Sequence, residues 1–460
     1  YFIMTKPHHC RFLLINTMTP LMVILVITLS GSVSSQCLTG DDNPSVMEAD
    51  FKHVLEESRM DFAFESLKKT AEIETTENIF YSPHSLHEAL TLAYFSARGT
   101  TEESLRKALH VPERYSKNYV QRFYQFENSM RNIMREVGNS SSDYDFRTAN
   151  KLWVTKERRI RECMLALFGT QIEHVDFKTN PEAVRTTVNN WASNETKGHI
   201  KDLIPSGGIT ETSDLVLANA VYFKGLWKSR FDPANSKKDN FYLSGSRVSM
   251  VTYMKQKGTF SHVVSDDIGA HILQLPYKGD EISMYILLPP FADTRRSDDK
   301  SNAPLDPIRQ LIDRITGPSN GATEIRSILE DGMPGREVEI HLPKFSIDKE
   351  LPVGQLLNAM GAGELLSPLA DLTGLLADGE PSLHLGDAVH RAVVDVSEEG
   401  TTATAATALF SFRSSRPAEP AVFNANHPFL YFIYDRPSRS ILFTGVYRSP
   451  PTTSSTSSYV

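Results

Sequence analysis

The residues best suited to take part in chemistry lie in a segment near the C-terminus, from Glu398 to Arg416. Two arginines, Arg413 and Arg416, stand there among small polar residues and close to Phe412. A trypsin-like protease binds a cationic side chain in an Asp-lined pocket, whereas a chymotrypsin-like protease prefers an aromatic one. The segment therefore predicts a site on which another enzyme acts.

The sequence carries no signature of an enzyme of its own. It has no Gly-x-Ser-x-Gly elbow, no His-Glu-x-x-His pair, no Walker loop and no dinucleotide fingerprint. Its 14 histidines are scattered without the spacing of metal ligands. We therefore expect no catalytic residue, no metal and no cofactor. A secreted hydrolase whose triad assembles from distant residues is the disfavoured alternative.

The stretch that precedes the arginines is unusual for a loop. An alternating strand pattern ends near Ser397, the chain turns at Gly400, and residues 401–408 are all Thr or Ala. A flexible linker would be rich in Gly and Ser. This run has no charge and no proline, and its threonines favour extended structure, so we interpret it as a spare strand that can join a sheet.

The hinge segment resembles that of inhibitory serpins, the trapping inhibitors of serine proteases. It consists of Glu398, Glu399, Gly400, Thr401, Thr402, Ala403, Thr404, Ala405, Ala406, Thr407 and Ala408. Five further stretches match the family in the same order: 78–85, 97–101, 219–227 with 231–233, 342–345 and 423–430. The resemblance implies an α+β fold, a single domain of helices plus three β-sheets with an exposed reactive loop.

The mechanism is what this resemblance implies. A serine protease attacks the loop and forms a covalent acyl-enzyme, and the freed hinge then inserts into the central sheet and traps it. The inward-facing residues would be Thr401, Ala403, Ala405, Thr407 and Leu409, none of which would bury a charge. A non-inhibitory carrier or storage protein is the alternative, and the uncharged hinge favours the inhibitor.

The resemblance also assigns roles to residues outside the loop. Ser82, Ser85, Asn219 and His390 match a polar cluster under the central sheet called the shutter, while Trp227 and Glu398 match the breach, where the loop first inserts. Taken without the resemblance, Ser82, Ser85 and Asn219 would only cap a helix and end a strand, and His390 would be a core histidine.

The position of the scissile bond stays open among neighbouring residues. The family spacing from Glu398 places it between Ser414 and Ser415. Arg413 would fit a loop one residue shorter, and Pro417 disfavours cleavage after Arg416. The order of preference is Arg413, Ser414, Arg416 and Phe412, which predicts a trypsin-like target.

Helical patterning dominates from Phe51 to about Arg135, and strands prevail from Asp214 onward. Ser82 followed by Pro83 predicts a helix N-terminus. Residues 291–304 form a polar insertion. We expect one serpin domain over 51–449 with its reactive loop at about 398–422, followed by a disordered tail at 450–460.

The N-terminal residues predict export. Lys6 and Arg11 precede an apolar run at 21–27 and small residues at 30–35, so we interpret 1–35 as a signal peptide, with 1–3 upstream of Met4. Residues 36–50 would be a flexible leader. The mature protein would be secreted and extracellular, a monomer with no membrane attachment. The sequons at Asn139 and Asn194 are candidate glycosylation sites.

Removal of the signal peptide leaves Cys37 and Cys163 of the three cysteines. Because Cys37 would lie in a mobile terminus, we expect two free thiols or an intermolecular bond, with one bridge between them as the alternative.

The charge of the chain limits its partners. A formal net charge of −8 excludes a nucleic-acid binder. One group of cations lies in a region that binds sulfated polysaccharide in some serpins: Arg106, Lys107, His110, Arg114, Lys117 and Arg122. Glu102, Glu103 and Glu113 are interleaved with them, so a solvated face is the favoured interpretation.

Overall fold

The structure is a computed structural model that describes residues 37–38, 50–137, 144–244, 247–291, 306–383, 385–399 and 420–450. The helices are α2 (Phe51–Ile73), α3 (Pro83–Ser96), α4 (Gly99–Ala108), α5 (Lys117–Val137), α6 (Glu162–Phe168), α7 (Pro181–Glu195), α8 (Pro307–Thr316), α9 (Asn320–Asp331) and α10 (Val353–Ala359). The strands are β1 (Ile79–Tyr81), β2 (Tyr144–Thr155), β3 (Ile172–Val175), β4 (Leu215–Gly225), β5 (Lys237–Ser244), β6 (Arg247–Ser265), β7 (Ala270–Pro276), β8 (Ile282–Leu288), β9 (Gly335–Pro343), β10 (Phe345–Leu351), β11 (Asp387–Val396), β12 (Ala421–Asn424), β13 (Phe429–Asp435) and β14 (Ser440–Tyr447).

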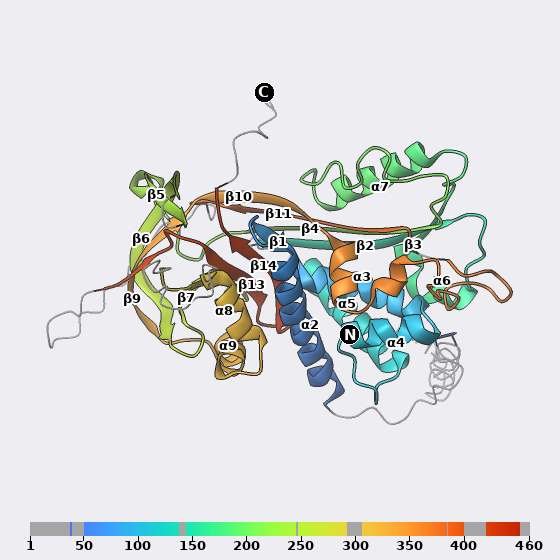
Figure 1. Cartoon of the computed structure of the whole chain (residues 1–460), viewed down its shortest axis with the longest axis horizontal. Helices are drawn as coiled ribbons and strands as arrows, with labels where there is room; N and C mark the ends of the chain where they lie inside the picture. Colours follow the sequence, from blue (N-terminus) through green and yellow to red (C-terminus); the bar gives the residue numbers. More distant parts are fainter. Residues whose placement is uncertain are drawn as a thin grey trace, which may run out of the picture.

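A five-stranded sheet in the order β10-β11-β4-β2-β3 runs through the molecule between helices (Figure 1). In β4, Leu215 and Leu217 pack into the core that includes α3, whereas Val216 and Ala218 pack into the core under α7. Both faces of this strand are therefore buried, which explains its almost continuous apolar sequence. β4 and β11 are parallel neighbours, and every other contact of these two strands within the sheet is antiparallel.

The second sheet follows the order β1-β14-β13-β8-β7-β6-β9-β12, with β5 paired to β6. Strand β6 is 19 residues long and pairs along its length with β5, β9 and β7. Hydrogen bonds through β6 therefore join the second and third of the expected sheets into one. The expected α+β architecture of helices and sheets is confirmed.

Helix α3 starts where the sequence predicts. The side chain of Ser82 accepts a hydrogen bond from the backbone N–H of Ser85 at 3.1 Å, and Pro83 occupies the first turn. This capping satisfies a backbone donor that the helix itself leaves unpaired. Among the described helices, none combines the length and the apolar character needed to cross a bilayer.

The expectation of two free thiols is wrong. Cys37 and Cys163 form a disulfide with a Cα–Cα distance of 5.9 Å. Cys37 and Leu38 are buried in the main core, so this part of the expected leader packs against the folded chain and brings the thiol to α6. A lone cysteine near a terminus gave no sign of this packing in the sequence.

Several sequence-based predictions fall outside the described residues. These are the whole signal peptide, most of the leader, the sequon Asn139, nearly all of the polar insertion, the part of the hinge from Gly400 to Ala408, the scissile region 412–416 and the tail from 451. They stay predictions.

Candidate functional site: a polar row across the central sheet

Three polar side chains lie side by side across the middle of the five-stranded sheet. Asn150 of β2 is paired in register with Asn219 of β4, and Asn219 is paired with His390 of β11. We call these three residues the polar row. Asn219 and His390 are fully buried, and buried polar groups of this kind must be hydrogen-bonded. The row therefore links β2, β4 and β11 by side chains as well as by backbone.

The predicted cluster residues do meet at this row. The backbone N–H of Ser82 donates to Nε2 of His390 at 3.0 Å, and Nδ1 of His390 bonds to Oδ1 of Asn219. Nδ2 of Asn219 donates to Oγ of Ser85 at 2.5 Å. Ser82 Oγ donates to the carbonyl of Leu442 in β14 at 2.6 Å, which fixes the helix start against the second sheet.

The ring of His390 is held in one protonation state. Burial lowers the pKa of His390 to about 3, so the imidazole is neutral near pH 7. Because Nε2 accepts from a backbone N–H, Nδ1 must carry the proton and donate to Asn219. The neutral tautomer is therefore specified by the fold.

Sequence reasoning missed the other half of this network. Oγ of Ser85 bonds to Oγ1 of Thr148 at 2.7 Å, and Thr148 donates to Oε2 of Glu88 at 3.3 Å. Nδ2 of Asn150 donates to the same Glu88 oxygen at 3.3 Å. The available signal was a carboxylate about one helical turn beyond Ser85, on a helix that also buries His84 and Thr91.

A second group of contacts lies at the carboxyl end of β11, where the predicted loop begins. Nε1 of Trp227 donates to the carbonyl of Ser397 at 2.9 Å, and its indole stacks on Tyr277 at 4.5 Å. The carboxylate of Glu398 accepts from Ser236 at 2.7 Å and from Lys344 at 2.8 Å. Trp227 and Glu398 are thus brought to the same end of the sheet.

The electrostatics of Glu398 favour its charged form. Burial would raise the pKa of Glu398, but the hydrogen bonds from Lys344 and Ser236 outweigh it and hold the pKa below its usual value. The pKa of Lys344 is raised in turn by the hydrogen bond to Glu398. The start of the hinge is therefore anchored by an ion pair.

These contacts lie at one end of the boundary between β4 and β11. A chain that leaves the carboxyl end of β11 and turns back would run antiparallel to β11 and also to its parallel neighbour β4. Antiparallel pairs are slightly more stable per residue than parallel ones. We call the β4–β11 boundary the seam, and separating its strands breaks the bond between Asn219 and His390.

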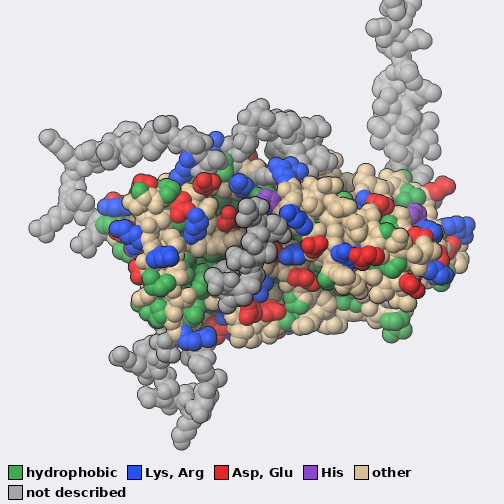
Figure 2. Space-filling view, turned by 90° about the horizontal axis from the view of Figure 1, so that it is seen from above, with side chains coloured by type: hydrophobic (Ala, Val, Ile, Leu, Met, Phe, Trp, Pro, Cys, Tyr) green, Lys and Arg blue, Asp and Glu red, His purple; other side chains and the backbone are tan. Residues whose placement is uncertain are grey.

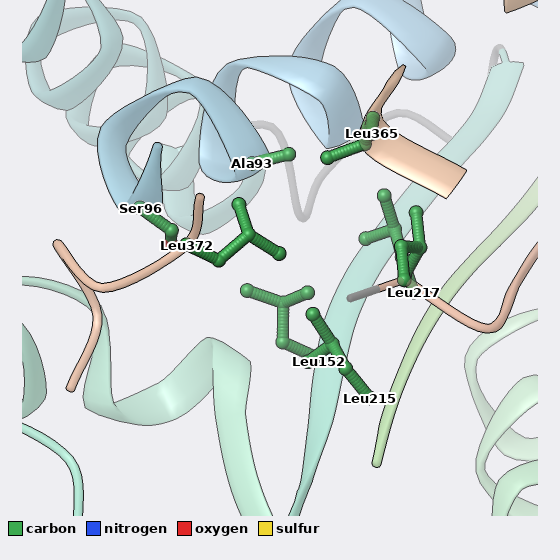
Figure 3. A pocket seen from close by; sticks show the side chains of 8 residues that line it. Ala93, Ser96, Leu152, Leu215, Leu217, Leu365 and Leu372 are labelled. Carbon is green, nitrogen blue, oxygen red and sulfur yellow. The ribbon is translucent and has the colours of Figure 1, made fainter. Parts of the chain in front are cut away.

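The cavities of the described residues are small. One, of about 10 Å³, is lined by leucines of β2 and β4 and by Ala93 and Ser96 of α3, whose side chains point to a common space in Figure 3. Another, of about 20 Å³, lies between α2, α3 and α5. Both are far below the several hundred Å³ of a typical ligand site. Within the described ranges, no group of three or more metal-ligating side chains is found.

The candidate polysaccharide-binding cations are largely paired with carboxylates. Arg106 and Lys107 both contact Glu103, at 2.8 and 3.1 Å. Lys117 is buried against Glu102, with 2.9 Å between the charged atoms. Elsewhere on the surface, on the face drawn in Figure 2, basic and acidic side chains are also interspersed. Arg122 is exposed on α5, so the described surface supports a solvated face here.

The sequon at Asn194 lies near the end of α7, where Asn194 is exposed. Thr196, the third residue of the sequon, is buried, and its hydroxyl donates to the carbonyl of Ala192 and accepts from the N–H of Ile200. The asparagine thus has access to solvent while the threonine supports the turn after the helix.

Comparisons with known proteins agree with this geometry. A family model described as "Serpin (serine protease inhibitor)" matches residues 57–450. Serine protease inhibitor 88Ea of Drosophila melanogaster is 35% identical over 449 residues, which cover 94% of this chain and 99% of that protein. Serpin B3 of Homo sapiens is 31% identical, and the match covers 84% of this chain and 96% of Serpin B3. The crystal structure of maspin superposes with a TM-score of 0.73 at 24% identity, covering 87% of this chain and 100% of maspin, and this likeness shows the fold.

Proposed function

Since the chain belongs to the serpin family, we propose that it is a secreted inhibitor of trypsin-like serine proteases that traps the acyl-enzyme by inserting its reactive loop into the seam. The observation that carries the proposal is that an uncharged Thr/Ala run follows β11, one of the two parallel strands between which it would insert. The hinge begins at Glu398, which an ion pair holds at the carboxyl end of β11.

The energetics support insertion as the source of the trap. A new strand of about ten residues adds hydrogen bonds worth roughly 1 kcal/mol net each, and its small side chains bury no charge. A gain on the order of 10 kcal/mol is comparable to the whole stability of a typical folded domain. It is therefore sufficient to distort an attached protease before water completes hydrolysis.

The target class follows from the residues of the scissile region. Arg413, or Arg416 further along, would bind an Asp-lined specificity pocket, and the alternative bonds at Ser414 and Phe412 would suit other proteases. The serpin itself supplies no catalytic group, because the protease performs the acylation and the inhibitor then holds the product.

Secretion is supported by independent features of the chain. The signal-like N-terminus predicts export, and disulfides such as Cys37–Cys163 form and persist mainly in oxidising compartments. The exposed Asn194 is a glycosylation site in this proposal.

The decisive experiment incubates the purified protein with trypsin, a thrombin-like protease and a chymotrypsin-like protease, followed by a denaturing gel and intact mass. We expect an SDS-stable adduct of protease plus the chain up to the cut. The mass of the separated C-terminal fragment will place the bond among 412–416.

Two results would count against the proposal. Clean cleavage with no adduct for any protease of the panel would favour the non-inhibitory carrier or storage protein. Hydrolysis of a generic peptide or ester substrate by the protein alone would revive the hydrolase.

A further inference from the structure

The polar row belongs to a longer hydrogen-bond chain that runs in one direction. It begins at the backbone N–H of Ser82, which can only donate, and passes through His390 to Asn219. From Asn219 it divides into two branches. Both branches end on the same oxygen, Oε2 of Glu88, whose carboxylate can only accept.

The two branches have separate intermediates. In the first, Asn219 donates to Oδ1 of Asn150, and Nδ2 of Asn150 donates to Glu88. In the second, Asn219 donates to Ser85, which bonds to Thr148, and Thr148 donates to Glu88. Because the two ends have fixed roles, every amide and hydroxyl between them has only one orientation that satisfies all bonds.

We propose that Glu88 is a positioning residue that sets the direction of this chain and thereby holds the seam closed until cleavage. The carboxylate requires Asn150 to present its N–H₂ toward α3, which leaves Oδ1 for Asn219. Asn219 then has only Oδ1 to offer His390 across the seam. Glu88 lies on α3 and reaches the seam through Thr148 and Asn150 of β2.

The surroundings of Glu88 are suited to this role. The residue is 6% exposed, and His84 of the preceding helical turn lies 3.5 Å from its other oxygen, Oε1. A hydrogen bond with a charged acceptor is roughly twice as strong as a neutral one, and in a buried site its direction is costly to reverse. A neutral, isosteric side chain at this position could donate as well as accept, so the orientation of Asn150 would be fixed from the Ser82 end alone, with a weaker hydrogen bond at the other end.

The inference rests on the proposed function for its biological meaning, but its test needs no protease. Hydrogen–deuterium exchange of the intact purified protein measures opening of the seam directly. In Glu88→Gln, we expect exchange of backbone amides in β4 and β11 to rise about tenfold, while amides of β13 and β14 keep the wild-type rate.

A second substitution, combined with Glu88→Gln, should restore the direction of the hydrogen bond between positions 88 and 150. Asn150→Asp alone would place two carboxylates against each other, and we expect its seam to open as well. In the double variant Glu88→Gln, Asn150→Asp, the new amide donates to the new carboxylate, and an acceptor again faces Asn219. The Thr148 hydroxyl, which donates to the same oxygen of Glu88, then loses its acceptor, so only one branch is restored. We therefore expect seam exchange to fall below that of Glu88→Gln without reaching the wild-type rate.

The control is Thr91→Val, one turn further along α3. Thr91 is also buried, but its hydroxyl bonds only to the carbonyl of His87. We expect no rise in exchange confined to the seam. If Glu88→Gln fails to fold, Thr148→Val, which breaks only one branch, should give a smaller increase at the same amides.

The inference is overturned if Glu88→Gln leaves seam exchange unchanged, raises exchange equally in β13 and β14, or is not partly rescued by Asn150→Asp. These outcomes are distinct from failure of the proposed function, which is read from the protease adduct of the wild-type protein. Trapping without a Glu88 effect would reject the role of Glu88 alone.

Discussion

The seam between β4 and β11 and the pairing of β13 with β14 are built in opposite ways. β13 and β14 are antiparallel, every residue of β14 is buried, and aromatic rings such as Phe443 and Tyr447 pack around them. The seam is parallel and carries Asn219 and His390 at its centre. Separating β13 from β14 would expose buried aromatic rings to water, whereas the polar groups at the centre of the seam can form other hydrogen bonds when its strands part. This difference indicates that the seam, and not the β13–β14 pair, is the boundary suited to open.

The largest effect is expected from a charge at the start of the hinge. Thr401→Arg would bury an unpaired cation when the loop inserts, at a cost of roughly several kcal/mol. We expect the protease to cleave this variant as a substrate, so the number of inhibitor molecules consumed per trapped protease rises at least about tenfold. Titration of protease activity against inhibitor measures this ratio. An unchanged ratio would refute insertion at the seam.

A substitution in the β13–β14 pair should affect stability without affecting trapping. Phe443 is fully buried, and its ring stacks on Phe80 with 5.2 Å between the centroids. Phe443→Ala should lower the free energy of unfolding by about 3–5 kcal/mol in the intact protein and equally after loop cleavage. Denaturant unfolding of both forms tests this, with the exposed Val422→Ala as control. A loss confined to the intact form would contradict the contrast between the two boundaries.

The sequence predicted the framework better than the network. Buried strands and the capped helix start at Ser82 follow from local pattern, because burial and capping leave a signature within a few residues. The resemblance singled out Ser82, Ser85, Asn219 and His390, and the structure brings them together. Thr148, Asn150 and Glu88 were missed, since their contacts depend on the register of β2 beside β4 and on helix packing. The disulfide was missed because it depends on where residues 37–38 pack.

A pH effect of intermediate size is expected at the seam. Burial lowers the pKa of His390 to about 3, so below about pH 6.5 the unfolded chain binds a proton that the folded chain refuses. This contribution to stability is complete above pH 6.5 and is lost as the pH falls toward 3, by about 2 kcal/mol at pH 5. His390→Gln should be less stable at pH 7 but flatter between pH 7 and 5, as unfolding curves will show.

His87 provides a matched comparison for this experiment. Burial lowers its pKa to about 3 as well, so it adds a similar pH dependence from outside the polar row. His87→Gln should also flatten the pH profile but leave exchange at the seam unchanged. Faster seam exchange in His87→Gln would show that the polar row is not the specific restraint.

The smallest effect is expected at the end of the seam. Lys344 is 46% exposed in its side chain, so the ion pair with Glu398 contributes about 1 kcal/mol or less. Glu398→Gln should lower the melting temperature of the intact protein slightly and leave that of the loop-cleaved protein unchanged. Calorimetry of both forms tests this, and an equal decrease in both would show that Glu398 does not restrain the seam specifically.

The two anchors of the reactive loop belong to different sheets. The strand before it, β11, lies in the five-stranded sheet, whereas β12, which follows it, pairs with β9 in the other. A cut within 412–416 therefore divides the protein into two polypeptides, and the smaller one supplies β13 and β14 from the interior of the nine-stranded sheet. The cleaved protein is thus a noncovalent heterodimer that migrates as one particle under native conditions, and its two new chain ends are free to move apart without any strand of the nine-stranded sheet leaving its place.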